Sequence, residues 1–494
     1  MHSTRKRSSN LVLSLAAGSV LLSCISTSPL LAHSDSAPTY PNPVINQATV
    51  YTTCHDTGDK LTPTKLQPFT PLPQPQENDP CIFLDPTHRF QTIVGFGGAF
   101  TDSAAENFYK LSPAKQQEVL TAYFSPDKGI GYTLGRTTIN SCDFSDSSYS
   151  YDDTPGDTKL THFSIDHDMK YKIPFIKAAM AASGNKLNIF ASPWSPPAWM
   201  KTNNDMEHGG KLKDEDRQAW ADYFVRYVHA YQAAGVPIWG LTIQNEPLAV
   251  QSWESCIVTA QDEHEFIRDY LGPDLQKSGL SGVKLMIWDH NRGMMYQRAE
   301  EIYSDPKTSK YVWGMAYHWY SGDHFENPEP VHDAWPDKPL IFTEGTVYFW
   351  PGHLDDASQA EPYAKSEILD LNHWSTGWTE WNLILDQNGG PFHDGNPCSA
   401  PVIVDTTTGD VRYLTSYYYL GQFSKFIKPG AQRIACTSDD DRLIATAFIN
   451  PDNSIATVVL NETDSTHDFK VWIDGRAVSA HTPAHSIETV VLSQ

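Results

Sequence analysis

The sequence predicts an α/β fold, a (β/α)8 TIM barrel with a β-sandwich at its side, and three observations support this. The chain has 494 residues, which is too long for one compact sandwich but suits one large barrel with a smaller companion domain. Short apolar runs alternate with longer amphipathic segments through residues 91–425, as they do in parallel α/β folds. From about Arg433 the pattern becomes entirely strand-like, with Asp, Asn and Gly turns between the strands.

Residues 1–32 have the pattern of an export signal. Arg5, Lys6 and Arg7 precede the apolar stretch 11–25, which is too short and too rich in serine for a membrane span. Two processing routes stay open: residues 21–24 (LLSC) resemble a lipoprotein signal that would anchor the protein at Cys24, and cleavage after Ala32 would give a secreted protein. We expect an extracytoplasmic protein with no integral membrane span in its mature form.

Residues 33–90 are rich in proline and are predicted to form a linker and the N-terminal strands of the sandwich, because repeated prolines exclude a continuous helix or a central strand. Without Cys24, six cysteines remain, an even number that fits an oxidising compartment. Cys54 and Cys81 flank the proline-rich segment and are the pair we expect to form a disulfide, although spacing alone does not determine connectivity.

The barrel strands are predicted from five short apolar runs that end in polar residues: 187–191, 238–243, 284–288, 313–317 and 340–343. Residues 218–234 and 261–271 between them have apolar positions at helical spacing. The segment 95–98 (GFGG) lacks the spacing of a dinucleotide-binding loop, and we expect it to form a tight turn that brings Asp102 to a pocket. Residues 426–494 are assigned to the C-terminal sandwich, with strands at 443–449, 454–460 and 489–492.

Glu246 is the first candidate catalytic residue. It lies in Gln244-Asn245-Glu246-Pro247, directly after a predicted buried strand, and catalytic groups of such barrels lie at the C-terminal ends of strands. An isolated glutamate is usually a solvated surface residue, but an Asn-Glu-Pro after a buried strand is uncommon at the surface. Apolar surroundings would raise the pKa of this carboxyl and suit a proton donor.

Glu344 is the second candidate, one residue after the predicted strand 340–343. It follows Glu246 by 98 residues (344 minus 246), room for two intervening barrel strands. If the two carboxylates converge to about 5–5.5 Å, one can attack an anomeric carbon while the other protonates the leaving group. A nucleophile has to stay ionised, so we expect hydrogen-bond donors around Glu344, with Tyr320 and Arg136 as candidates.

Other chemistries find little support in the sequence. Lys and Arg number 36 against 59 Asp and Glu, a net charge of −23, which disfavours nucleic acid as a partner. The chain has no Gly-x-Ser-x-Gly, His-Glu-x-x-His, Cys-x-x-Cys or Walker motif. We therefore expect no metal and no cofactor.

Several longer motifs follow one another in order along nearly the whole chain after the signal: 95–105 (GFGGAFTDSAA), 141–145 (SCDFS), 153–157 (DTPGD), 191–203 (ASPWSPPAWMKTN), 245–247 (NEP), 316–320 (AYHWY), 377–383 (GWTEWNL) and 423–427 (FSKFI). Together they resemble glycoside hydrolase family 30, in particular its glucosylceramidases.

The resemblance implies a barrel whose side sandwich is built from both chain ends, with Glu246 as acid/base and Glu344 as nucleophile. It implies that a sugar-binding subsite is lined by Asp102, Trp194, Asn245 and Trp381. It also implies that Arg136, His318 and Tyr320 support the nucleophile.

The implied activity is that of a retaining β-glucosidase that cleaves glucosylceramide to glucose and ceramide at a membrane or micelle surface. Two departures affect the leaving-group side: Trp378-Thr-Glu-Trp381 replaces Trp-Thr-Asp-Trp, and the loop 389–395 (GGPFHDG) lacks a tryptophan. An endo-β-1,6-glucanase or another β-glucosidase of the same family remains the first alternative. A non-catalytic sugar- or lipid-binding protein is more remote, because both carboxylates are present.

Overall fold

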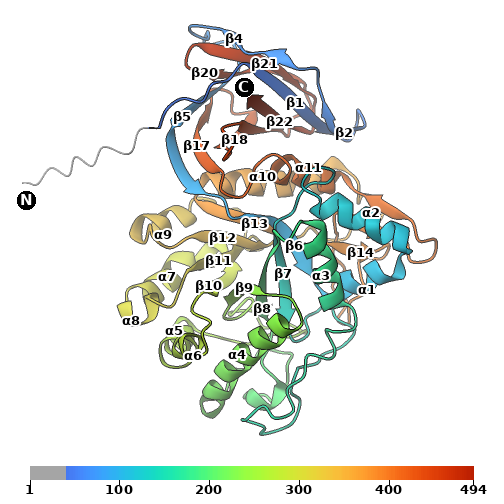
Figure 1. The fold of residues 1–494 in the computed structure, drawn as a ribbon, viewed down its shortest axis with the longest axis vertical. Coiled ribbons are helices and arrows are strands. Elements are labelled where there is room, and N and C mark those ends of the chain that lie inside the picture. Colours follow the sequence, from blue (N-terminus) through green and yellow to red (C-terminus); the bar gives the residue numbers. More distant parts are fainter. Residues whose placement is uncertain (1–39) are drawn as a thin grey trace, which may run out of the picture. The chain divides into compact units, whose positions relative to one another are not determined.

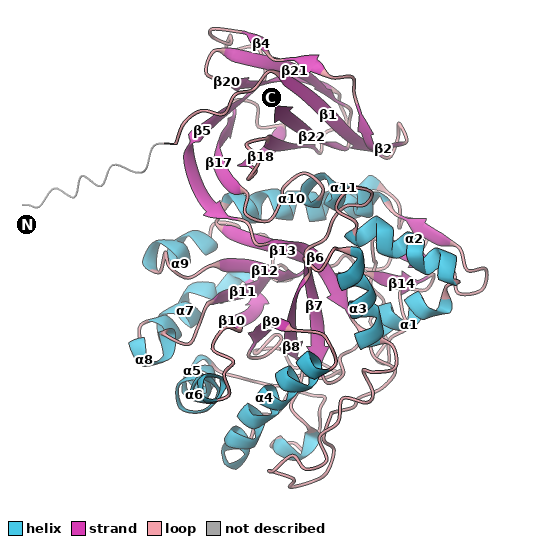
Figure 2. Ribbon diagram, in the orientation of Figure 1, coloured by secondary structure: helices cyan, strands magenta, loops and turns pink. Residues whose placement is uncertain are grey.

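The computed structural model describes residues 40–494, so the export signal, Cys24 and both cleavage sites lie outside the described residues. Within residues 40–494 the chain forms a closed barrel, a sheet of strands from both chain ends and a small three-stranded sheet (Figures 1 and 2). The predicted barrel and sandwich are confirmed. None of the helices in this range is long and apolar enough to cross a lipid bilayer.

Eight parallel strands close the barrel in the order β10-β11-β12-β13-β6-β7-β8-β9. Their residues are almost all buried, because helices cover the outside and side chains fill the inside. The strands are β6 (Gly95–Phe100), β7 (Leu134–Ile139), β8 (Asn188–Pro193), β9 (Ile238–Thr242), β10 (Lys284–Asn291), β11 (Gly314–His318), β12 (Leu340–Glu344) and β13 (Ser375–Asn382).

Eleven α-helices follow or connect these strands, and several begin at the caps that their sequences specify. The side chain of Thr101 caps α1, Ser112 caps α2 ahead of Pro113, and Thr259 forms a capping box with Asp262 on α5. The helices are α1 (Asp102–Lys110), α2 (Pro113–Phe124), α3 (Lys172–Ala182), α4 (Arg217–Ala233), α5 (Ala260–Phe266), α6 (Gly272–Lys277), α7 (Met295–Tyr303), α8 (Pro306–Ser309), α9 (Pro328–Ala334), α10 (Ala357–Asn372) and α11 (Thr415–Ser424).

The GFGG segment is a barrel strand, β6, and the expected tight turn is wrong. Its glycines are required because neighbouring strands come too close for a side chain: a Cβ on Gly97 would lie 1.9 Å from the carbonyl oxygen of Leu134. One on Gly98 would lie 2.7 Å from the side chain of Leu383. Glycine therefore marks close packing here and not a change of chain direction.

Within residues 40–494, strands from both chain ends share one eleven-stranded sheet, in which blue strands lie beside orange and red ones in Figure 1. β1 pairs antiparallel with β22 over its whole length, and β5 pairs with β17. The strands are β1 (Gln47–Cys54), β2 (Asp59–Pro63), β3 (Gln67–Pro68), β4 (Thr70–Pro71), β5 (Cys81–Thr92), β17 (Gln432–Ser438), β18 (Leu443–Ile449), β19 (Ile455–Asn461), β20 (His467–Ile473), β21 (Arg476–Thr482) and β22 (Ser486–Ser493). The small sheet contains β14 (Ile384–Asp386), β15 (Val402–Val404) and β16 (Val411–Tyr413).

The expected disulfide between Cys54 and Cys81 is wrong. Cys54 ends β1 and Cys81 begins β5, and the strands β22, β19, β18 and β17 lie between them in the sheet. A disulfide needs Cα atoms within about 7 Å, and adjacent strands already take up about 4.8 Å each. All six cysteines of the described residues are free thiols.

Candidate active site

A cavity of about 450 Å³ opens at the C-terminal ends of the barrel strands. Glu246 and Glu344 both line it, and so do three of the residues predicted to bind a sugar, Trp194, Asn245 and Trp381. A larger cavity of about 580 Å³ lies beside Gln244. Its cations Lys211 and Arg217 are already paired with Asp262 and Glu265, and it holds neither candidate carboxylate.

The two carboxylates converge although they come from separate strands. Glu344 is the last residue of β12, whereas Glu246 follows β9 by four residues, and β10 and β11 lie between them. A carboxylate oxygen of Glu246, one of Glu344 and a ring nitrogen of His318 all lie within 4.8 Å of one another. Glu246 adopts a left-handed backbone conformation, with φ of 47°, which is strained for a residue with a side chain and is typical of functional sites.

Glu344 is surrounded by hydrogen-bond donors. The Tyr320 hydroxyl donates to Oε1 at 2.9 Å, and the Arg136 guanidinium donates to Oε2 and pairs with its charge. Both predicted donors therefore contact this carboxylate. These two contacts hold the carboxylate of Glu344 in a fixed orientation toward the cavity.

Arg136 is fully buried and connects three groups of the site. Besides Glu344, its guanidinium donates to Asn245 Oδ1 at 2.8 Å and to Asp289 Oδ2 at 2.9 Å. Asp289, which sequence reasoning missed, is also buried and accepts hydrogen bonds from hydroxyls and from a histidine. These donors are Ser192, Thr242, Thr343 and His318. Such charge-assisted bonds fix the geometry of Arg136 more than any single contact would.

His318 contacts the acid/base candidate and not the nucleophile that it was expected to support. Its Nδ1 lies 3.4 Å from Glu246 Oε1, and its Nε2 lies 3.0 Å from Asp289 Oδ1. Burial opposes the charged form of the ring, but the nearby charge of Glu344 and these two hydrogen bonds raise the pKa of His318 to about 9. The ring is therefore cationic at neutral pH.

The expected rise in the pKa of Glu246 is wrong. Burial would raise this pKa, but the hydrogen bond and charge of His318, with the charge of Arg136, bring it below the usual value. The apolar strand before Glu246 suggested a purely desolvating environment. The structure adds cations from β11 and β7, which the local sequence does not reveal.

Trp194 and Trp381 form an aromatic wall of the cavity. Their rings stack with centroids 5.2 Å apart, and the Arg136 guanidinium lies 4.7 Å from the Trp194 centroid. Flat indole faces suit the apolar faces of sugar rings. Arg136 donates a hydrogen bond to Asn245 Oδ1, so the side-chain NH₂ group of Asn245 can still donate to a ligand.

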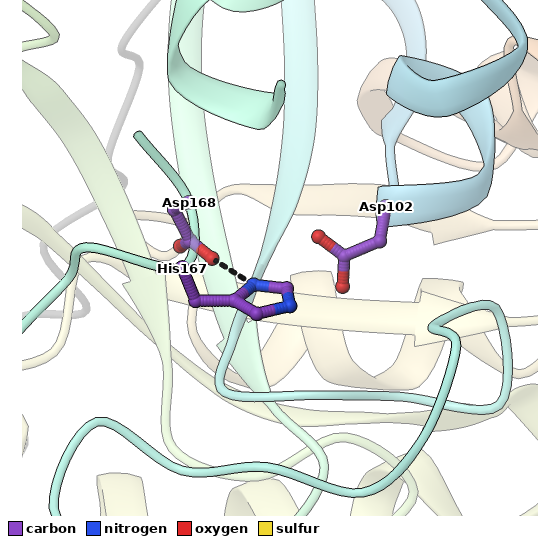
Figure 3. Close-up of side chains that lie close together, drawn as sticks. All are labelled: Asp102, His167 and Asp168. Atoms are coloured by element: carbon purple, nitrogen blue, oxygen red, sulfur yellow. Dashed lines mark hydrogen bonds and ion pairs between the residues drawn. The ribbon is translucent and has the colours of Figure 1, made fainter. Parts of the chain in front are cut away.

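Asp102 is not among the residues that line the cavity. It begins α1, and its carboxylate accepts hydrogen bonds from Ser145 and Tyr149 and pairs with Lys172 at 3.2 Å. Figure 3 shows it facing His167 and Asp168, which hydrogen bond to each other. Lys172 is 3.3 Å from Asp168 as well, so its ammonium group already supplies the cation for this acidic cluster.

Asp143 lines the cavity instead and was missed by sequence reasoning. Its carboxylate accepts a hydrogen bond from Asn396 at 3.0 Å, and burial raises its pKa to about 7. The signal was present, because Asp143 lies within the 141–145 motif that carries the family resemblance. The motif was noted for its likeness only, without asking which of its side chains reaches the pocket.

Comparison with known proteins decides the family. The model of the glycosyl hydrolase family 30 TIM-barrel domain matches residues 93–427, and the model of the family 30 beta sandwich domain matches residues 430–490. The chain belongs to glycosyl hydrolase family 30. It is accordingly a glycoside hydrolase, and the cavity with Glu246 and Glu344 is its candidate active site.

The names of the relatives of this family 30 chain state two different activities. A lysosomal acid glucosylceramidase of Mus musculus is 37% identical over 430 residues, 83% of this chain and 82% of the relative. An endo-1,6-beta-D-glucanase of Neurospora crassa is 32% identical over 395 residues, 76% of this chain and 79% of the relative.

Two solved structures share the fold over 91% of this chain. SrfJ from Salmonella typhimurium has a TM-score of 0.87, 32% identity and full coverage of its own chain. The endo-beta1,6-glucanase BT3312 has a TM-score of 0.82 and 30% identity, with 99% of its chain covered. These likenesses extend over barrel and sandwich together.

The chemistry of the family 30 site does not favour a metal ion. Glu246, His318 and Glu344 are close enough to share one, but His318 is cationic and Arg136 already neutralises charge on Glu344 and Asp289. A divalent cation would meet two positive groups in a buried space.

Proposed function

We propose that the protein is a retaining β-glucosidase that hydrolyses glucosylceramide to glucose and ceramide. The observation that carries the retaining mechanism is the separation of Glu246 and Glu344, whose nearest carboxylate oxygens lie within 4.8 Å. Retaining enzymes hold their carboxyl groups about 5–5.5 Å apart, whereas inverting enzymes leave about 6.5–9.5 Å for a water. Oxygen atoms that approach this closely support the shorter spacing of a retaining enzyme.

In the first step Glu344 attacks the anomeric carbon and forms a glucosyl ester, while Glu246 gives its proton to the departing ceramide oxygen. In the second step Glu246, now ionised, takes a proton from water, and the resulting hydroxide equivalent cleaves the ester. Arg136 and Tyr320 stabilise the Glu344 carboxylate before attack and when it leaves. The proton that Glu246 gives to the leaving group in the first step is replaced in the second step by the proton that it takes from water.

The lowered pKa of Glu246 has a role in this cycle. A bound glucose unit displaces water from the cavity and increases the burial of Glu246, which favours its protonated form. When the glucosyl ester forms, Glu344 loses its negative charge, and His318 then stabilises Glu246 as the ionised base. The same carboxyl group thus changes protonation with each step.

The loops that follow the two carboxylates support a lipid leaving group. Leu248 and Val250 come after Glu246, and Tyr348 and Trp350 come after Glu344; all four are exposed, Tyr348 by 68% and Val250 by 64%. Tyr348 also lines the cavity itself. Leu248 and Val250 are sequence neighbours of the cavity-lining Ala249 and Gln251, and exposed apolar side chains near a cavity are typical of surfaces that meet a lipid or a membrane. The glucosylceramidase relative agrees with this substrate.

An endo-β-1,6-glucanase is the second candidate. The likeness to the glucanase structure, with a TM-score of 0.82, favours it. The outer cavity also contains polar side chains that suit a second sugar, Gln251, Asn291 and Asn396. In this case Tyr348 and Trp350 would serve as stacking surfaces for further glucose units. Glu246 and Glu344 would keep their roles.

The deciding experiment incubates the purified mature protein with glucosylceramide in detergent micelles and, in parallel, with β-1,6-glucan. Release of ceramide and glucose without oligosaccharides is the expected result. Oligosaccharides from the glucan without ceramide would contradict the lipid substrate and assign the enzyme to polysaccharide degradation. The Glu344→Gln variant serves as the blank in both assays, so that a contaminating activity is recognised.

We also propose that the enzyme acts outside the cytoplasm, either secreted or anchored through Cys24. The export signal pattern in residues 1–32 supports this. Mass spectrometry of the mature N-terminus, with and without lipase treatment, distinguishes cleavage after Ala32 from lipidation at Cys24. An intact Met1 in protein from the native host would contradict export.

A further inference from the structure

His290 lies beside the acid/base candidate, in a position that an ordinary strand would not give it. In a regular strand successive side chains point to opposite faces, so Asp289 and His290 should not both reach the active site. The pairing of β10 with β11 is interrupted by a bulge between Trp288 and His290, where Trp288 and Asp289 have φ of 75° and 53°. Bulges redirect side chains in this way near active sites. Asp289 consequently binds Arg136, and His290 lines the cavity.

The two ring nitrogens of His290 have different surroundings. Nδ1 is enclosed, has no hydrogen-bond partner and lies 3.8 Å from Glu246 Oε1. Nε2 is not among the enclosed atoms and makes no hydrogen bond within the described residues, so it is the ring nitrogen that a ligand in the cavity can reach. Burial, despite the nearby negative charge of Glu246, lowers the pKa of His290 to about 4. The ring is therefore neutral, with one nitrogen that donates and one that accepts.

The leaving group is the part of the substrate that meets this side of the cavity. Glu246 has to reach the glycosidic oxygen in order to protonate it. A side chain next to Glu246 on the cavity wall therefore lies close to the atoms of the leaving group that are bonded to this oxygen. Tyr320 and Arg136 hold the other carboxylate, under the sugar ring. His290 is thus placed against the first atoms of the leaving group and not against the glucose unit.

We propose that His290 is a specificity-determining residue, whose Nε2 binds a hydroxyl or amide group of the leaving group next to the glycosidic oxygen. This inference rests on the proposed β-glucosidase activity and adds the chemistry of the leaving-group side. A neutral imidazole suits the task because it binds a neutral polar group without placing a second cation beside His318. Ceramide and a second sugar both carry such a group, whereas a simple aryl leaving group does not. His290 therefore selects for a polar leaving group close to the scissile bond.

The test compares His290→Phe and His290→Gln with the wild type on three substrates. These are 4-nitrophenyl β-D-glucoside, whose leaving group has no hydrogen-bonding group near the glycosidic oxygen, the β-1,6-linked glucose disaccharide, and glucosylceramide in micelles. For His290→Phe we expect kcat/KM on whichever hydroxylated substrate the wild type cleaves to fall about 10–100-fold, the cost of losing a buried hydrogen bond. On the aryl glucoside it should stay within about twofold, and His290→Gln should recover part of the loss.

Two outcomes overturn the assignment. An equal loss on all substrates means that His290 acts through Glu246 and not on the leaving group, and no loss on any substrate means that it has no role in binding. Thermal unfolding of each variant excludes a folding defect as the cause of a selective loss. The wild-type rate on the aryl glucoside reports on the β-glucosidase activity alone, so a failure of the proposed function and a failure of the His290 assignment give different results.

Discussion

Arg136 donates a hydrogen bond to Glu344 although both side chains are buried, and the charge of each is compensated only by neighbours inside the barrel. Arg136 also pairs with Asp289 and holds Asn245. A planar guanidinium reaches three acceptors at once, which an ammonium group does not. Glu344, the side-chain amide of Asn245 and the carboxylate of Asp289 thus share one cation.

Replacing Arg136 by methionine should therefore damage folding and catalysis together. Removing one partner of a buried ion pair leaves uncompensated charge and costs about 3–5 kcal/mol, and here Glu344 and Asp289 both lose the guanidinium, although Asp289 keeps His318. We expect a clear fall in the midpoint of thermal unfolding, and Arg136→Lys should restore stability only in part. Arg442→Met is the matched control, since Arg442 is exposed and pairs only with Asp440. An unchanged midpoint for Arg136→Met would contradict the network described here.

Glu344→Gln should remove turnover and retain sugar binding. The amide cannot attack the anomeric carbon, so hydrolysis of an aryl β-glucoside should fall by about 10⁴-fold or more. The cavity wall of Trp194 and Trp381 is untouched by the change. Glucose or a glucose-like inhibitor should therefore still bind, which isothermal calorimetry measures. Turnover at the wild-type rate would rule out Glu344 as the nucleophile.

Glu246→Ala should affect substrates according to their leaving groups. An acidic leaving group such as dinitrophenol departs without a proton, so its substrates should keep most of the first step, whereas poor leaving groups should lose about 10²–10⁴-fold. Added azide should restore part of the rate, because it replaces the water that Glu246 no longer activates, and it should yield β-glucosyl azide. An equal loss for all leaving groups, without rescue, would argue against the acid/base role.

The pH dependence of stability should report on His318. Its pKa of about 9 in the folded protein lies above the usual value of about 6.5. Its contribution is therefore complete below pH 6.5 and is lost as the pH rises through 9, by about 3 kcal/mol in total. The unfolding free energy of the wild type should fall more steeply over this window than that of His318→Gln. His393, whose pKa is also raised to about 9, titrates in both proteins and cancels in the difference. Parallel curves would show that His318 is not charged in the folded state.

The sequence was sufficient to locate residues that are marked by the pattern of their immediate neighbours. Glu246 and Glu344 were found because each directly follows an apolar run, and the C-terminal ends of barrel strands meet at one face. Strand β6 was misread because glycine usually indicates a turn, whereas here it allows neighbouring backbones to approach. Asp289 and His290 directly follow the predicted strand 284–288, so the same local signal was present, but an ordinary strand end would not bring both side chains to the site, whereas the bulge in β10 does. The charge of His318 depends on three carboxylates from other strands, which periodicity does not place.

The exposed side chains after Glu344 should distinguish a lipid substrate from a soluble one. Tyr348 and Trp350 are 68% and 52% exposed, so more than half of each residue is open to solvent. If they contact the lipid part of the substrate, Tyr348→Ser with Trp350→Ser should lower hydrolysis of glucosylceramide in micelles about tenfold or more, the value of burying part of two aromatic side chains. Hydrolysis of a soluble aryl glucoside should stay unchanged. Leu66→Ser, which removes an exposed apolar side chain away from the cavity, is the control. Loss of activity on β-1,6-glucan in the double variant, with the lipid rate intact, would instead identify these rings as stacking surfaces for sugars.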